Sequence, residues 1–299
     1  MEQPLVTVIC LCYNQKRFVV ETLQSVLNQT YQPIELIVVD DCSPDKSAEI
    51  IETFLENKPI LFIKNTVNQG STKSFNLALK HAKGTFVMDL AADDVLLPEC
   101  IEQLVARFQN SKFENLAAVA SNAMYIDEDG QFLSYHFPVN ESKNVLQKRP
   151  IGDVYKYILK GGDNLFSAST LVKKSVFDQL GGYDEKLYFE DFDFWLRMSR
   201  VFNFDFVDAP LFQKRVVKNS MGSSFQNPKN PKNKTINRSY FEVLKKAYHL
   251  NQNKLEFKAL TKRVHFAILL SLKNRDFALF LQLILFRMSV FFKPFFLKN

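Results

Sequence analysis

Short buried strands that alternate with helical segments constrain this chain more than any other feature of its sequence. Runs of apolar, often β-branched residues predict strands buried on both faces at residues 6–12, 34–39, 60–63 and 85–90. Apolar residues at helical spacing lie between these runs, at residues 18–28, 43–55 and 71–81. Ser43 and Pro44 are the predicted N-cap and first residue of the second helix. The alternation indicates an α/β fold with a mostly parallel sheet and right-handed crossovers.

A pair of polar residues follows three of the predicted strands. The pairs are Tyr13-Asn14, Asp40-Asp41 and Asp93-Asp94. Because ligands of open parallel sheets bind at the carboxyl ends of the strands, we expect one shared site rather than three independent loop caps. The chain has no Gly-x-Gly-x-x-Gly fingerprint and no Gly-Lys-Ser/Thr loop for phosphate groups. A bound phosphate would therefore need a metal held by carboxylates.

Further short motifs follow these pairs in a fixed order between residues 4 and 215. They are residues 6–14, 23–31 and 35–43, then Asn68-Gln-Gly70, Ala82-Lys-Gly84 and Ala91-Ala-Asp-Asp94, and finally Gly181-Gly-Tyr-Asp-Glu185 and Glu190-Asp191-x-Asp-x-Trp-Leu-Arg197. The ordered set resembles the family-two inverting glycosyltransferases. The resemblance implies a GT-A (nucleotide-diphospho-sugar transferase) fold. It also implies transfer of a sugar from a nucleotide-diphosphate donor to a glycan or lipid-linked acceptor, in bacterial surface polysaccharide synthesis.

The resemblance also implies roles for the residues of the donor site. Tyr13, next to Asn14, would stack on the nucleobase, and Asp41 would accept a hydrogen bond from it. Asp93 would bind Mn²⁺ or Mg²⁺ on the donor diphosphate, and hard oxygen ligands suit both ions. Lys73 is a further candidate for donor binding through its positive charge.

Each of these residues also has a purely structural interpretation. Tyr13 is equally explained as an aromatic at a strand end, and Asp41 as a cap of the Ser43-Pro44 turn. The Asp93-Asp94 pair is explained as the N-cap of a following helix, a role that fits Asp94 better than Asp93.

The metal motif departs from the family pattern in two places. Ala91 stands where relatives carry a first Asp, and Asp89 is two residues out of register with that position. Many relatives have a metal-ligating His after the last strand of the sheet, whereas residues 215–218 contain none. We therefore expect a sparse metal site, with Lys73 or Arg215 as candidates for the missing positive charge.

The acidic motif after residue 189 carries the implied chemistry. Asp191 would be the general base that takes a proton from the acceptor hydroxyl, with Glu190 as the neighbour that shares or replaces this role. Trp195 and Arg197 would line the site or brace the base. The alternatives are an acidic first helical turn that suits the helix dipole, a core tryptophan and a structural ion pair.

The expected domain organisation is a catalytic domain over residues 1–217, a loop or linker over 218–235 and a helical region over 236–299. Residues 1–215 hold 22 basic and 29 acidic side chains, whereas residues 216–299 hold 16 and 3. The basic, Phe-rich tail predicts contact with an anionic membrane surface; the alternative is a helical hairpin packed on the body or on a second subunit. Nucleic acid is not expected as a partner, because no nucleic-acid motif accompanies the charge.

The expected location is the cytoplasm, peripherally on the inner face of the membrane. No signal peptide precedes the first strand, the apolar run in the tail is too short to span a bilayer, and the four cysteines are expected to be reduced. The rival function is a non-catalytic nucleotide-sugar or glycan binding protein with a degenerate metal site. A nucleotidyltransferase is a second rival, but residues 11–14 do not form the basic, Gly-rich loop that such an enzyme needs.

Overall fold

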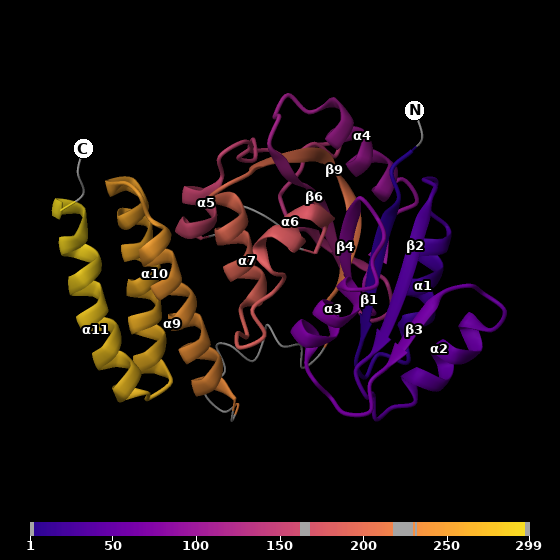
Figure 1. The fold of residues 1–299 in the computed structure, drawn as a ribbon, viewed down its shortest axis with the longest axis horizontal. Helices are drawn as coiled ribbons and strands as arrows, with labels where there is room; N and C mark the ends of the chain where they lie inside the picture. Colours follow the sequence, from indigo (N-terminus) through magenta and orange to yellow (C-terminus); the bar gives the residue numbers. More distant parts are fainter. Residues whose placement is uncertain (1–2, 162–167, 218–229, 231, 297–299) are drawn as a thin grey trace. The chain divides into compact units, whose positions relative to one another are not determined.

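The computed structural model describes residues 3–161, 168–217, 230 and 232–296. The chain forms two compact units (Figure 1). The first unit comprises Met1–Gly152, Leu165–Tyr183 and Phe202–Val216, and the second comprises Asp153–Asn164, Asp184–Val201 and Val217–Asn299. The expected linker at 218–235 lies mostly outside the described residues, so its bounds stay a prediction.

A nine-stranded sheet forms the centre of the first unit, in the order β3-β2-β1-β4-β8-β6-β9-β5, with β7 paired to β6. The strands are β1 Val6–Cys12, β2 Ile34–Asp40, β3 Leu61–Lys64, β4 Phe86–Ala91, β5 Val95–Leu96, β6 Leu116–Ile126, β7 Phe132–Tyr135, β8 Thr170–Lys173 and β9 Asn203–Arg215. Strands β1 to β4 are parallel to one another, and β8 runs antiparallel to β4 and β6. The predicted α/β fold class is thus confirmed.

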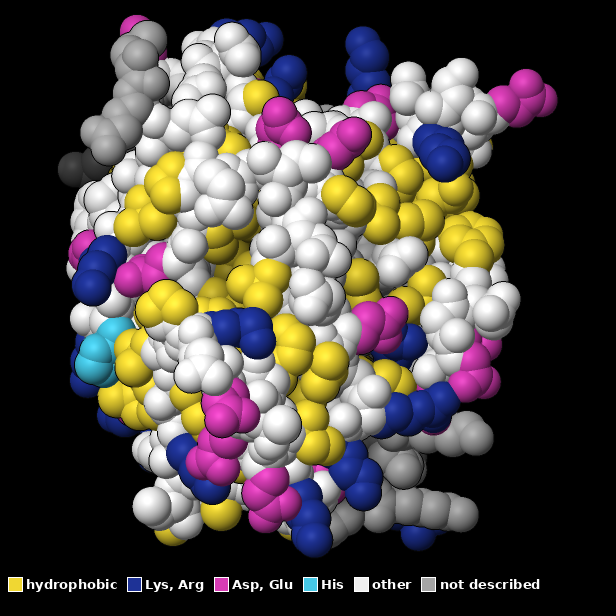
Figure 2. Space-filling model, turned by 90° about the vertical axis from the view of Figure 1, so that its right-hand side faces the viewer, with side chains coloured by type: hydrophobic (Ala, Val, Ile, Leu, Met, Phe, Trp, Pro, Cys, Tyr) yellow, Lys and Arg dark blue, Asp and Glu magenta, His cyan; other side chains and the backbone are white. Residues whose placement is uncertain are grey.

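Helices cover this sheet because each presents an apolar stripe to it. They are α1 Val19–Leu27, α2 Ser47–Leu55, α3 Ser71–Leu79, α4 Cys100–Asn110 and α6 Lys174–Leu180. In α1 the buried residues Val19, Leu23 and Val26 recur at helical spacing. Burying each such side chain contributes roughly 1.5–3 kcal/mol to folding. On the outer side, Figure 2 shows apolar side chains interspersed with basic and acidic ones, as is ordinary for a solvent-exposed surface.

The predicted start of α2 was wrong. The helix begins at Ser47 rather than after Ser43, and its N-cap residue Lys46 has a φ of 69°. Ser43, Asp45 and Ser47 instead accept hydrogen bonds from the backbone of residues 14–16, at 3.0, 3.0 and 3.1 Å. These side chains hold the loop after β1, so Ser43 is not available to cap its own helix.

The second unit is helical. It contains α5 Tyr155–Lys160, α7 Glu190–Ser199, α9 Asn233–Leu250, α10 Lys254–Lys273 and α11 Phe277–Phe292, followed by a 3₁₀ turn at Lys293–Phe296. Helices α9, α10 and α11 lie side by side (Figure 1). Asn253 caps α10 and Asp276 caps α11 through their side-chain oxygens. The predicted helical C-terminal region is confirmed.

Candidate active site

The polar residues that follow the parallel strands lie at one edge of the sheet, the edge formed by the carboxyl ends of these strands. In the strand register Cys12 is opposite Asp40, and Leu11 is opposite Ala91. The backbone pairing continues past the strand ends, because Asp41 N donates to Cys12 O and Ala92 N to Leu11 O, each at 2.9 Å. The order β2-β1-β4 therefore brings Asp41, Tyr13 and Asp93 to neighbouring positions.

The Asp41 carboxylate organises the loop between β3 and α3. Its Oδ1 accepts hydrogen bonds from Asn65 Nδ2, Gln69 N and Ser74 Oγ, at 2.8, 2.9 and 3.0 Å. Its Oδ2 accepts one from Gly70 N at 2.8 Å, and Gly70 has a φ of 88° that favours glycine. The Asn68-Gln-Gly70 motif therefore folds around Asp41.

Asp41 is not the cap of the Ser43-Pro44 turn. Asp40 has that role, since its Oδ2 accepts from Ser43 N at 2.9 Å. Each carboxylate oxygen accepts about two hydrogen bonds, and among the described residues Oδ2 of Asp41 accepts only the one from Gly70. One acceptor position thus remains on this buried group. Tyr13, at the next strand end, is 49% exposed.

Asn14 and Lys73 lie at the margins of this edge. Asn14 follows Tyr13 with a φ of 59°, and its backbone N–H donates to Ser43 Oγ. Lys73 is exposed on the first turn of α3, the helix whose entry Asp41 fixes. The positive end of the α3 dipole adds to the charge of this lysine.

Asp93 lies on a loop whose backbone is hydrogen-bonded to the buried side chain of Arg215. Arg215 Nε donates to Asp93 O at 3.0 Å, and its Nη1 and Nη2 donate to Asp127 O at 3.1 Å and to Glu21 Oε2 at 2.7 Å. Arg215 is thus committed to the loop that carries Asp93. The Asp93 side chain accepts a hydrogen bond on Oδ2 from Gln15 Nε2 at 3.1 Å, and its Oδ1 has no partner among the described residues.

Asp94 is an internal ion-pair residue, so its predicted helix-capping role was wrong. It is followed by β5, and α4 begins only at Cys100. Its carboxylate accepts from Lys214 Nζ at 2.8 Å and from Arg215 N at 3.0 Å. Burial, opposed by Lys214 and reinforced by Asp93, raises the pKa of Asp94 to about 6.

Lys214 is a member of this group that the sequence did not reveal. Burial disfavours its ammonium group, but attraction by Asp94 and then Asp93 outweighs burial and raises the pKa of Lys214. In the sequence Lys214 lies in a polar stretch, Gln213–Arg215, which gives no sign of a buried partner.

The donor groups near Asp93 fit a metal that takes most of its ligands from a substrate. The described residues contain no group of three or more His, Cys, Asp or Glu side chains placed to hold an ion. Mg²⁺ binds proteins through one or two carboxylates and completes its shell with waters and phosphate oxygens. Asp93 Oδ1 offers one such ligand. Asp89 lies further back on β4, with its Oδ2 3.4 Å from Tyr183 Oη.

The Gly181-Gly182-Tyr183 motif forms a turn that Asn76 clamps. Asn76 accepts from Tyr183 N at 3.1 Å and donates to Tyr183 O at 2.9 Å. Gly182 has a φ of 70°, and a Cβ there would lie 2.8 Å from Asn76 Oδ1. The turn thereby packs the Tyr183 ring 4.6 Å from the ring of Phe75.

The predicted base lies in the second unit. Glu190 and Asp191 are half-buried in the first turn of α7, where the helix dipole favours acidic side chains. Trp195 is buried on the same helix. Arg197 Nε donates to Asp193 Oδ2 at 2.8 Å, so it braces Asp193 rather than Asp191.

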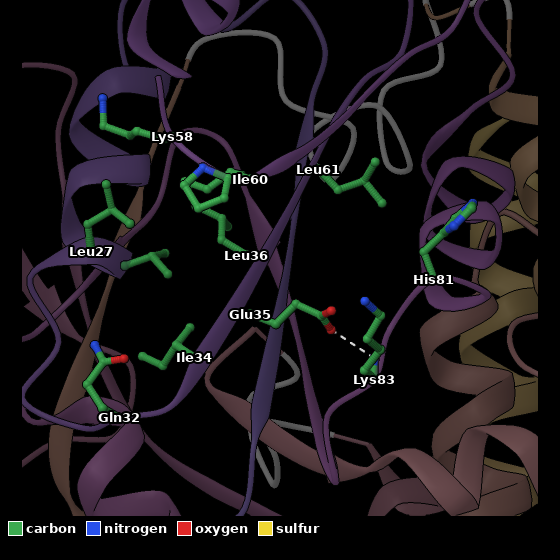
Figure 3. A pocket seen from close by; sticks show the side chains of 12 residues that line it. Leu27, Gln32, Ile34, Glu35, Leu36, Lys58, Ile60, Leu61, His81 and Lys83 are labelled. Atoms are coloured by element: carbon green, nitrogen blue, oxygen red, sulfur yellow. Dashed lines mark hydrogen bonds between the residues drawn. The ribbon is translucent and has the colours of Figure 1, made fainter. Parts of the chain in front are cut away.

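A cavity of about 490 Å³ lies at the opposite edge of the sheet, the edge formed by the amino ends of the parallel strands (Figure 3). It is lined by Val26, Leu27, Gln32, Ile34, Glu35, Leu36, Lys58, Pro59, Ile60, Leu61, His81 and Lys83. Apart from Val26 and Leu27 at the end of α1, these residues begin or precede β2 and β3 or precede β4, so the cavity adjoins the amino ends of the parallel strands. Glu35 accepts hydrogen bonds there from Thr7 Oγ1 and Lys83 N, at 2.6 and 2.8 Å. No predicted site residue lines this cavity.

Comparisons with known proteins identify the family and the fold. The family described as glycosyl transferase family 2 matches residues 7–180. An uncharacterized glycosyltransferase of Methanocaldococcus jannaschii is 31% identical over 221 residues, 72% of each chain.

Two solved structures share the fold. A fragment of S. aureus TarS in complex with UDP-GlcNAc has a TM-score of 0.70 at 18% identity, covering 95% of this chain and 81% of that one. The mannosyltransferase PcManGT from Pyrobaculum calidifontis, in complex with GDP-Man and Mn²⁺, has a TM-score of 0.53 at 16% identity, covering 100% and 89%.

Proposed function

The chain belongs to glycosyl transferase family 2 and has the GT-A fold, and we propose that it moves a sugar from a nucleotide-diphosphate donor to a glycan or lipid-linked acceptor with inversion. The observation that carries this proposal is the grouping of Tyr13, Asp41 and Asp93 at one edge of the parallel sheet. That edge is where ligands of such sheets bind.

Tyr13 and Asp41 hold the nucleobase in this proposal. The exposed Tyr13 ring offers a stacking face, and the remaining acceptor position on Asp41 Oδ2 takes an N–H of the base. Asn14 and Lys73 contact the rest of the nucleotide. The loop from Gln69 to Gly70 is preorganised for this by its bonds to Asp41, so little ordering remains to be done on binding.

Asp93 binds Mn²⁺ or Mg²⁺ together with the donor diphosphate. When bound, the ion offsets the negative charge that builds on the leaving nucleoside diphosphate. Because Ala91 replaces the first family carboxylate, Asp93 is the main protein ligand, and we expect the affinity for metal to be low without the nucleotide. The TarS and PcManGT complexes, with UDP-GlcNAc and with GDP-Man and Mn²⁺, support a donor of this class.

Asp191 acts as the general base, with Glu190 as its neighbour. A carboxylate that accepts the acceptor hydroxyl proton lets the oxygen attack the anomeric carbon opposite the leaving group. One displacement of this kind inverts the anomeric configuration. Trp195 and Arg197 support the helix that carries the base.

A donor-binding and transfer experiment tests the reaction. We expect the purified protein to bind one nucleoside diphosphate in a titration with Mn²⁺, and to release it from a donor sugar when an acceptor is present. Asp191→Asn should abolish transfer and leave donor binding intact, whereas Glu190→Gln should retain transfer. Binding without turnover across a panel of donors and acceptors would instead favour the non-catalytic binding protein, which the missing carboxylate at Ala91 makes the second candidate.

The setting is the inner face of a bacterial cytoplasmic membrane, in surface polysaccharide synthesis. One face of α11 is apolar and exposed, with Phe277, Leu281 and Leu285 each more than 60% exposed. All three acidic side chains after residue 216 are paired: Glu242 with Lys245, Glu256 with Arg200, and Asp276 with Arg238. The basic side chains therefore dominate the field of this region and attract anionic lipid.

By length and composition, the stretch Phe277–Phe295 is apolar enough to cross a membrane, and 17% of it is buried. This is longer than the apolar run expected from the sequence. Leu279, Leu283 and Val290 of α11 are nevertheless buried against neighbouring helices, which favours a helix lying in the interface.

Sedimentation with phosphatidylcholine vesicles, with and without phosphatidylglycerol, tests this setting. We expect binding that requires the anionic lipid and is lost in Leu281→Lys/Leu285→Lys. The control Val67→Lys places the same charge on an exposed apolar position of the first unit and should bind like the wild type. Equal binding of both variants would exclude α11 as the contact, and self-association without lipid would favour a second copy of the chain.

A further inference from the structure

Helix α9 contacts residues 184–193. This segment leads into α7 and includes the first turn of that helix. Tyr188 N donates to Ser239 Oγ at 2.7 Å. The Tyr240 ring lies 6.0 Å from the ring of Phe192, with only 25° between the two planes. These contacts attach the acidic turn to the C-terminal helices through both its backbone and its side chains.

Lys246 of α9 joins two carboxylates of this segment. Its Nζ lies 2.6 Å from Asp184 Oδ2 and 3.0 Å from Asp193 Oδ1. Asp193 is 1% exposed, and its other oxygen accepts from Arg197 Nε at 2.8 Å. Because Arg197 belongs to α7 itself, only the bond to Lys246 connects this buried carboxylate to another helix among the described residues.

The period of the α-helix shows how the bond between Lys246 and Asp193 affects the direction of Asp191. Side chains advance by about 100° per residue around an α-helix. Phe192 and Asp193 therefore share one face of α7, and both contact α9. Phe189, the N-cap residue before the helix, contacts α9 as well. Asp191 is about 200° from Asp193 and about 100° from Phe192, so it projects away from that face. When α9 holds one face of the turn, it sets the direction of Asp191 on the other.

We propose that Lys246 of α9 is a positioning residue for the base. This rests on the proposed role of Asp191. A carboxylate base works only within hydrogen-bond reach of the hydroxyl, and a displacement of about 1 Å can cost on the order of 10²-fold in rate. The family match ends at residue 180, so it contains neither Lys246 nor the turn that Lys246 holds.

The test compares Lys246→Met with Lys245→Met in the full chain. Lys245 is the adjacent lysine of the same helix, and among the described residues its contacts stay on that helix, with Glu242 at 2.6 Å and with the Phe241 ring at 5.2 Å. We expect Lys246→Met to lower kcat by about 10–100-fold, with the donor dissociation constant unchanged, and Lys245→Met to behave as the wild type. Lys246→Arg, which keeps the charge, should recover most of the activity. Lys246→Gln, which keeps a hydrogen-bond donor, gives the same comparison if the Met variant does not fold.

Amide hydrogen exchange of residues 189–193 separates the failure of this inference from the failure of the proposed function. Exchange there should accelerate in Lys246→Met and not in Lys245→Met. If the wild type transfers no sugar, the proposed function fails, while exchange still shows whether Lys246 holds the turn. Equal exchange in the two variants would overturn the positioning role. Faster exchange with an unchanged kcat would overturn its role in catalysis.

Discussion

Replacement of Lys214 by Met should destabilise the protein in a pH-dependent way. In the described part of the chain, the change leaves the fully buried Asp94 carboxylate with only the Arg215 N–H as a partner. Removing one partner of a buried ion pair costs about 3–5 kcal/mol. Because the Lys214 side chain is 33% exposed, we expect the lower end of this range, about 3 kcal/mol at pH 8.

The sign of the pH dependence follows from Asp94. Its pKa in the folded protein is raised from 3.8 to about 6 by burial, so the native state binds the extra proton between these values. Ionising the group therefore costs stability as the pH rises through this window. Without Lys214 the folded pKa rises further, and the deficit of the variant grows from pH 5 to pH 8. At pH 5 Asp94 is mostly protonated in both proteins, so the deficit should be small.

Urea unfolding at pH 5, 7 and 8 measures this difference. Lys64→Met is the matched control, because Lys64 pairs with Glu52 at the surface and such pairs contribute about 0–1 kcal/mol. Asp94→Asn in the Lys214→Met background should recover part of the lost stability at pH 8. A deficit equal to that of the control, or one that does not change with pH, would refute the assignment of Asp94 as a buried charge held by Lys214.

Two further predictions concern the loops around the site. Asp41→Asn should lower the free energy of unfolding by about 3 kcal/mol, because the new amide nitrogen would face backbone N–H donors, and it should also weaken donor binding. Urea unfolding and nucleotide titration measure the two effects, and a loss of stability below about 1 kcal/mol would contradict the hydrogen bonds assigned to Asp41. Gly182→Ala should lower the free energy of unfolding in urea by about 1–2 kcal/mol more than Gly181→Ala does. Both glycines have a positive φ, but only a Cβ at position 182 would meet Asn76. Equal losses of stability would contradict the clamping of this turn by Asn76.

Much of the fold was predictable from the sequence because each buried strand is a continuous run of apolar residues. The run at residues 6–12 coincides with β1, and the next run differs from β2 by one residue. Side-chain partners distant along the chain left no such trace. Lys214 and Asp94 are 120 residues apart, and Lys246 meets Asp184 across 62. The same limitation explains the wrong start of α2, since Ser43 bonds to Asn14, a partner that no local pattern reveals.

The two acidic pairs, Asp40-Asp41 and Asp93-Asp94, each contain one structural carboxylate and one that we propose to bind ligand. Side chains of adjacent residues at the end of a strand point to opposite sides. Asp40 accordingly caps the turn at Ser43, while Asp41 holds the loop before α3 and keeps one acceptor position. Asp93 and Asp94 lie in the turn between β4 and β5, which Asp94 N closes by donating to Ala91 O at 3.1 Å. Asp94 is paired there with Lys214, and Asp93 keeps an oxygen without a partner among the described residues. The turn therefore leaves Asp93, rather than Asp94, available for the metal role proposed above, independently of how many carboxylates the motif contains.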